Sequence, residues 1–166
     1  MRPLKEIDAV PLSVLLVDDN RTFLRILARF LSEQGEDALC VVGSVIGGQD
    51  AVAQAQRLHP DVILLDLAMP DVSGLTLLPT LRRTLPDAII IALTLMDPDS
   101  ARQATLAAGA DAFVSKTSLE RDLLPAIRRL VVREPEAARD VATCGLRGDD
   151  SGVTSRGTVS GGSHGA

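Results

Sequence analysis

Short aliphatic runs alternate along the chain with segments that are apolar on one side only. The runs are almost continuously apolar, which is typical of strands covered on both faces of a parallel sheet. They lie at 12–17, 38–42, 61–66, 88–94 and 111–115. The segments between them place apolar residues at helical spacing. They predict helices over about 20–35, 49–58, 73–84 and 99–108, and from 117 or 118 to about 133.

Five β–α units in succession predict an α/β fold of three layers, with a parallel sheet between two layers of helices. Right-handed crossovers join the strands of such a sheet. We expect the five-stranded order 2-1-3-4-5, which makes the first and third strands neighbours. Ligand sites in sheets of this kind lie at the carboxyl ends of the strands, near the point where the strand order reverses.

Two prolines test the helix predictions. Pro79 and Pro125 fall beyond the first turn of their helices, where proline removes a hydrogen bond and kinks or breaks the helix. We keep both helices, because each proline lies off the apolar stripe. At the first helix, Asn20 is suited to cap the start and Gly35 to end it.

Composition and charge limit the domain organisation and the class of function. The chain is 46% hydrophobic, enough for a substantial core, and its net charge of −5 argues against direct contact with nucleic acid. No apolar stretch reaches the roughly 18 residues that span a bilayer, and the N-terminus lacks a signal-peptide pattern, so we expect the cytoplasm. We expect an N-terminal extension over 1–11, one domain over 12–133 and a flexible Gly/Ser-rich tail over 134–166.

Three acidic residues follow buried strands of the predicted sheet. Asp18 and Asp19 end the first strand, and Asp66 ends the third. An aspartate at such a position often only caps the next helix, but three that meet at one edge raise one another's pKa and destabilise the fold. A hard divalent cation removes that repulsion, and Mg²⁺ prefers carboxylate oxygens, often together with phosphoryl oxygens. The acids therefore predict a Mg²⁺ site.

Lys116 and Thr94 stand at the ends of two further strands. Only two of the 17 basic residues are lysines, so a lysine at the end of the fifth strand is informative. Its ammonium is a compact charge suited to carboxylate or phosphoryl oxygens. The Thr94 hydroxyl can donate a hydrogen bond to an anionic oxygen. Together with Asp66, these groups favour attack of a carboxylate on phosphorus to form an acyl phosphate.

The motifs "LLVDDN", "LLDLAMPDVSGL" and "GADAFVSK", with Thr94 and the β–α register that joins them, resemble the receiver domain of two-component response regulators. The resemblance covers about residues 12–132 and implies a flavodoxin-like, CheY-like fold. It implies Asp66 as phosphoacceptor and Asp18 with Asp19 as the acidic Mg²⁺ pair. It also implies a main-chain carbonyl ligand at Ala68. Lys116 and Thr94 would then lie on the phosphoryl group.

The resemblance also implies the partners. The phosphodonor would be a histidine kinase or a histidine phosphotransfer protein, with Asn20 and Leu24 of the first helix as docking candidates. Phe113 matches the aromatic position that changes rotamer on activation. The signal would leave through the face formed by the fourth helix, fifth strand and fifth helix, toward an unknown output partner or a second copy of the chain.

Two of the departures from the family pattern concern the residues that directly follow Thr94 and Lys116. Leu95 follows Thr94, at a position where the family commonly has a small residue, so its bulk could narrow access to Asp66. Thr117 follows Lys116, where the family often has a proline after a cis peptide bond. A cis bond before a residue other than proline costs about 2.5–4 kcal/mol. We therefore expect a trans bond, with some shift of Lys116.

Four interpretations of the function follow. The leading one is a stand-alone receiver that signals through protein contacts and catalyses only its own phosphorylation and dephosphorylation. The sequence pattern is most similar to that of receivers of LuxR-type regulators, which usually carry a DNA-binding helix-turn-helix domain. A second interpretation is therefore a regulator of that type cut short of this domain. A third is a Mg²⁺-dependent phosphatase with Asp66 as nucleophile, although Ala68 stands where a general acid would be expected. A fourth, a pseudo-receiver that only binds partners, is disfavoured by the complete set of acids and lysine.

Overall fold

The computed structural model describes residues 10–95 and 98–132. Its strands are β1 (Leu12–Asp18), β2 (Leu39–Ile46), β3 (Val62–Asp66), β4 (Ile89–Thr94) and β5 (Ala112–Ser115). Its helices are α1 (Arg21–Gln34), α2 (Ala51–Leu58), α3 (Gly74–Thr84), α4 (Pro98–Ala107) and α5 (Leu119–Val131). All strand pairs are parallel, in the order β2-β1-β3-β4-β5. The predicted α/β fold and strand order are therefore confirmed.

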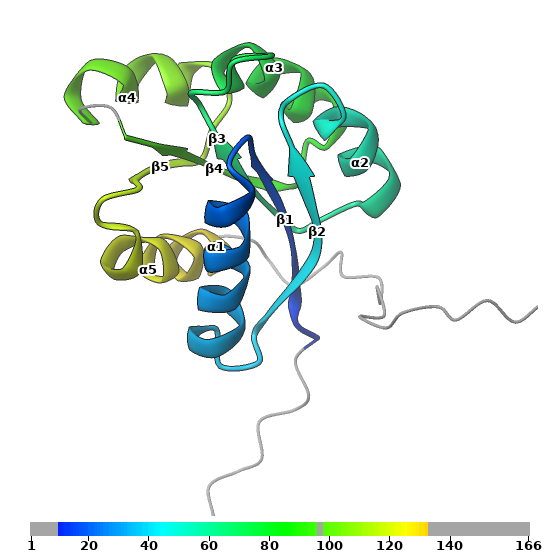
Figure 1. Ribbon diagram of the computed structural model, residues 1–166, viewed down its shortest axis with the longest axis vertical. Helices are drawn as coiled ribbons and strands as arrows, with labels where there is room; N and C mark the ends of the chain where they lie inside the picture. The colour runs from blue at the N-terminus through cyan, green and yellow to red at the C-terminus, as the bar shows by residue number, and fades with distance from the viewer. Residues whose placement is uncertain (1–9, 96–97, 133–166) are drawn as a thin grey trace, which may run out of the picture.

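The sheet lies between two layers of helices. Figure 1 shows α1 and α5 against one face, and α2, α3 and α4 against the other. Alternate residues of β1 divide between the two cores: Leu15 and Val17 pack toward α2 and α3, and Val14 and Leu16 toward α1 and α5. Because side chains alternate across a strand, a strand with two covered faces must be apolar at every position. This explains the continuous aliphatic runs in the sequence.

The structure confirms the predicted caps of α1 and both predicted helices that contain a proline. The Asn20 side chain caps α1, and Gly35 is the C-cap residue. Pro79 lies inside α3 and Pro125 inside α5, and both are exposed. The helices survive these prolines because each ring lies on the solvent side, where water can satisfy the carbonyl that loses its helical donor. Ser118, the second of the two predicted start positions, is the N-cap of α5.

The structure does not test the predictions for the two ends of the chain. The tail predicted over 134–166, and all but two residues of the extension predicted over 1–11, lie outside the described residues. Among the helices of the described part, none has the length and apolar character needed to cross a membrane.

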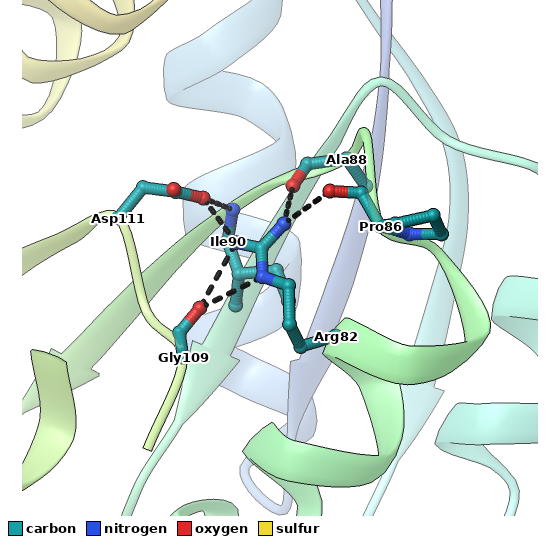
Figure 2. A network of polar contacts seen from close by, with 6 residues as sticks. All are labelled: Arg82, Pro86, Ala88, Ile90, Gly109 and Asp111. Atoms are coloured by element: carbon teal, nitrogen blue, oxygen red, sulfur yellow. Dashed lines mark hydrogen bonds and ion pairs between the residues drawn. The ribbon is translucent and has the colours of Figure 1, made fainter. Parts of the chain in front are cut away.

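Arg82, near the end of α3, connects this helix to two other segments (Figure 2). Its guanidinium donates to the backbone carbonyls of Pro86, Ala88 and Gly109 at 2.7–3.1 Å. It also pairs with the carboxylate of Asp111, which accepts a hydrogen bond of 2.8 Å from the backbone N–H of Ile90. One planar donor group thus fixes the end of α3 to the start of β4 and to the turn before β5.

Replacing Arg82 with Ala should lower the free energy of unfolding by about 2–3 kcal/mol, because half-buried carbonyls lose a charged donor. Arg82→Lys should recover only part of this, since an ammonium cannot reproduce the planar fork. Urea unfolding followed by circular dichroism measures both changes. Arg83→Ala is the matched control, because Arg83 is exposed, and it should change stability by no more than about 0.5 kcal/mol. Equal effects at the two positions would contradict this role of Arg82.

Candidate functional site

The candidate site is formed where four strands end at one edge of the sheet. Asp18 is the last residue of β1, Asp66 of β3 and Thr94 of β4, and Lys116 directly follows β5. Asp66 pairs in register with Leu93, the residue before Thr94. Since the strands are parallel, their carboxyl ends all point to this edge. The predicted convergence of these residues is therefore observed.

The acidic cluster has one exposed and two buried members. Asp18 and Asp66 are 1% and 3% exposed, whereas Asp19 is exposed. One carboxylate oxygen from each residue lies within 4.8 Å of those of the other two. Oxygen donors of this kind, with one side open to water, suit a hard divalent cation that retains water ligands. The donor set thus fits the Mg²⁺ ion that the sequence predicts.

Among the described residues, Lys116 is the one basic residue that forms ion pairs with this cluster. Its Nζ lies 2.6 Å from Asp18 Oδ2 and 3.2 Å from Asp66 Oδ1, and its side chain is only 10% exposed. None of the peptide bonds of the described part is cis, so the predicted trans bond before Thr117 is confirmed. With this trans bond, the Lys116 ammonium still reaches both carboxylates.

Burial raises the pKa of the Asp66 carboxyl above its usual value. The Asp18 carboxylate adds to this shift, while the backbone N–H of Ala68 and the Lys116 ammonium oppose it. A raised carboxyl pKa means that the folded protein binds this proton more tightly than the unfolded chain does. The resulting stability is present at low pH and is lost as the pH rises from the unfolded pKa through the folded one. At neutral pH the ionised Asp66 carboxylate therefore lowers the stability of the metal-free protein.

The loop after β3 holds Asp66 in place through its backbone. The N–H of Ala68 donates to Asp66 Oδ1 at 3.2 Å. Gly74, the first residue of α3, packs against the backbone of Asp66 and Leu67. A Cβ at Gly74 would lie 2.2 Å from the carbonyl oxygen of Asp66, far inside van der Waals contact. Only glycine allows α3 to start this close to the end of β3.

Asp71 was not singled out from the sequence, yet it joins the β3–α3 loop to the β2–α2 loop. Its Oδ2 accepts hydrogen bonds from the backbone N–H groups of Gly48 at 2.8 Å and Gln49 at 3.2 Å. The N–H of Val72 makes the largest contribution to holding the pKa of Asp71 below its usual value, and these two donors add to it. The Pro-Asp pair facing two consecutive glycines is the signal that could have indicated this contact.

Thr94 and Phe113 lie on the neighbouring strands β4 and β5. Thr94 is fully buried, and its carbonyl accepts a hydrogen bond of 2.8 Å from the N–H of Lys116. Phe113, on β5, is partly buried and packs against the core on the α2–α3 side of the sheet. Leu95, whose bulk could narrow access to Asp66, is 71% exposed.

The two docking candidates on α1 differ in accessibility. Asn20 is exposed, although its side-chain oxygen accepts the N–H of Phe23 as the helix cap, at 3.1 Å. Leu24 is only 4% exposed and packs in the core between the sheet and α1 and α5. The prediction that Leu24 is a docking residue is therefore wrong, because a side chain held in the core is not presented to a docking partner.

The Gly74→Ala variant should lose about 1–3 kcal/mol of unfolding free energy, because the new methyl group meets backbone atoms that cannot rotate away. The same displacement of Asp66 should slow any reaction at its carboxylate. Urea unfolding and a phosphorylation time course measure the two effects. Leu75→Ala is the control, since the neighbouring Leu75 is 40% exposed. If Gly74→Ala were as stable and as reactive as Leu75→Ala, the close packing at Gly74 would have no importance.

Comparison with known proteins gives a consistent result. The family model described as the response regulator receiver domain matches residues 14–128. The response regulator protein VraR of Staphylococcus saprophyticus is 33% identical over 120 residues, which are 72% of this chain and 56% of that protein. VraR of Staphylococcus aureus is 33% identical over 118 residues, 71% of this chain and 56% of that protein. The chain thus spans little more than half the length of these relatives.

Solved structures agree with the fold. The signal receiver domain of the putative response regulator NarL from Mycobacterium tuberculosis has a TM-score of 0.68 at 26% identity, covering 76% of this chain and all of that one. A LuxR-family two-component response regulator from Aurantimonas sp. SI85-9A1 has a TM-score of 0.68 at 22% identity, covering 74% of this chain and 86% of that one. From the matched residues, the relatives and the fold, the chain belongs to the receiver-domain family of response regulators, the phosphoacceptors of two-component systems.

Proposed function

We propose that this receiver accepts its phosphoryl group on Asp66. Asp18, Asp19, Asp66 and the main-chain carbonyl of Ala68 would hold Mg²⁺, and Thr94 and Lys116 would bind the phosphoryl group. The observation that carries the proposal is the position of the Lys116 ammonium, 2.6 Å from Asp18 and 3.2 Å from Asp66 in a nearly buried site. The proposal is the same whether the receiver acts alone or is joined to a further domain.

The reaction is the transfer of a phosphoryl group from an imidazole nitrogen of the donor to a carboxylate oxygen of Asp66. One Asp66 oxygen forms a bond to phosphorus, the bond between phosphorus and the donor's imidazole nitrogen breaks, and the imidazole leaves with the electron pair. Lys116 balances negative charge on the transferred oxygens, and the Thr94 hydroxyl donates a hydrogen bond to one of them. Bound Mg²⁺ would neutralise further charge on the phosphoryl oxygens.

The donor we propose is a phosphohistidine on a histidine kinase or a histidine phosphotransfer protein. Receivers of response regulators interact with histidine kinases as a family. Asn20 lies exposed two residues beyond Asp18 and is the docking candidate that we retain on α1. Because kinases draw their phosphoryl groups from ATP, we propose the cytoplasm as the compartment.

The output face we propose consists of α4, β5 and α5. Thr94 and Ser115 are paired in register, so a displacement of Thr94 toward a phosphoryl group would be transmitted to β5. Phe113 on β5 is only partly buried, which leaves its ring room to change position with the strand. A partner, or a second copy of the chain, would read the changed face.

The family is a signalling family, and the residues at the site agree with that role more than with a phosphatase. A phosphatase that forms an aspartyl phosphate needs a general acid for its leaving group. The residue two positions after Asp66 is Ala68, whose side chain has no proton to donate. We therefore propose that the only chemistry of the chain is its own phosphorylation and dephosphorylation.

The test is incubation of the protein with acetyl phosphate and Mg²⁺, followed by intact-mass spectrometry. The wild type should gain one phosphoryl group, because the small donor needs no docking surface. Asp66→Ala should gain none, because the attacking oxygen is missing. Asp19→Asn should need more Mg²⁺ for the same yield, because one oxygen ligand is weakened.

Asp87→Ala is the control, since Asp87 is exposed and belongs to the loop before β4, at the opposite edge of the sheet from Asp66. It should be phosphorylated like the wild type. Addition of a phosphoryl group to Asp66→Ala would overturn the assignment of the phosphoacceptor. Sustained hydrolysis of a generic phosphate ester by the wild type would instead favour the phosphatase.

A further inference from the structure

The Lys116 ammonium has a third neighbour besides its two carboxylates. Its Nζ lies 4.4 Å from the centre of the Phe23 ring, on α1. At that distance the negative face of an aromatic ring attracts an ammonium ion, and the attraction is greater when water is excluded. Because the Lys116 side chain is only 10% exposed, the contact belongs to the stronger class.

The backbone of Phe23 is tied by hydrogen bonds to the same loop that carries the acids. The Phe23 N–H donates to Asn20 Oδ1 at 3.1 Å, and the Asn20 N–H donates to Asp18 Oδ1 at 2.8 Å. Lys116 then closes a circuit of four contacts, from the Phe23 ring back to Asp18 Oδ2. The start of α1 and the end of β5 are joined in this way, although Lys116 lies 93 positions after Phe23 along the chain.

We propose that Phe23 is a positioning residue that keeps the Lys116 ammonium between Asp18 and Asp66 through a cation–π contact. Lysine has a flexible stem, and its ammonium group is strongly hydrated, so water competes with the carboxylates for it. Asp18 alone, at 2.6 Å, holds the ammonium more closely than Asp66 does at 3.2 Å. The ring restricts the remaining freedom of the ammonium, so that it is already in place when a phosphoryl group reaches Asp66.

A purely structural role for Phe23 is the alternative that the experiment must separate, because its ring also packs against the core beneath α1. Fluorine atoms on the ring weaken its negative face and change its shape only slightly. We therefore choose a series with phenylalanine, 4-fluoro-, 3,5-difluoro- and 3,4,5-trifluorophenylalanine at position 23. Phe30 is the matched control, because it lies on the same helix and packs against the same core.

The phosphorylation rate with acetyl phosphate and Mg²⁺ should fall stepwise along the series at Phe23, by about three- to tenfold in total. The unfolding midpoint should stay constant. The series at Phe30 should leave the rate unchanged. Phe23→Leu should be slow, and Phe23→Tyr should recover most of the rate. A rate that does not respond at Phe23, or that responds equally at Phe30, overturns the proposal.

The kinetic result rests on the proposed phosphoacceptor role of Asp66, so a second measurement tests the contact by itself. Lys116 and Lys5 are the only lysines in the sequence, so lysine-selective ¹³C labelling gives two sets of side-chain signals. The Lys116 methylene next to Nζ should be shifted by the ring current of Phe23, and Phe23→Leu should abolish that shift. An unshifted signal in the wild type overturns the cation–π contact, even if Asp66 is phosphorylated normally. A shifted signal in a protein that acetyl phosphate does not modify would count against the function and not against the contact.

Discussion

The contact between the Lys116 ammonium and the carboxylates of Asp18 and Asp66 is the interaction on which the carboxyl edge of the sheet depends. Two carboxylates that are almost fully buried repel each other, and burial raises the pKa of Asp66 and so disfavours its charged form. The ammonium lies within 3.2 Å of both and offsets one of the two charges. One buried negative charge therefore stays without a partner charge, and the exposed carboxylate of Asp19 adds a further negative charge at the surface. The site therefore favours the binding of further positive charge, which the proposed Mg²⁺ ion would supply.

Several neighbouring structures maintain this arrangement. Gly74 allows α3 to begin directly against the backbone of Asp66, and Asp71 ties the same loop to the N–H groups after β2. Arg82 fixes the opposite end of α3 to the start of β4 and to the turn before β5. The strands that deliver Asp66, Thr94 and Lys116 are thus held from both ends of α3. A site built this way keeps its reacting groups aligned without relying on a mobile loop.

The fold was predictable because its physical cause is visible in the sequence. A strand covered on both faces must be apolar throughout, so each strand of the sheet appears as an aliphatic run. The strand order then places Asp18, Asp19 and Asp66 together, and the scarcity of lysine draws attention to Lys116. Asp71 and Phe23 were missed for a different reason. Their importance arises from contacts between loops and helices distant in sequence, and no periodic pattern encodes such contacts. Leu24 shows the reverse error, since the apolar stripe of α1 directs it into the core.

The most direct test of this account is the free energy of unfolding of the wild type and of Asp66→Asn, measured by urea denaturation at neutral pH with and without Mg²⁺. Without Mg²⁺ the variant should be the more stable protein, because a neutral amide replaces a buried carboxylate whose pKa is raised by burial. Mg²⁺ should stabilise the wild type in proportion to the logarithm of its concentration above the dissociation constant, and should stabilise the variant much less. A wild type that does not respond to Mg²⁺, together with a variant less stable than the wild type, would contradict the central claim that this edge of the sheet carries uncompensated negative charge that a bound Mg²⁺ ion offsets.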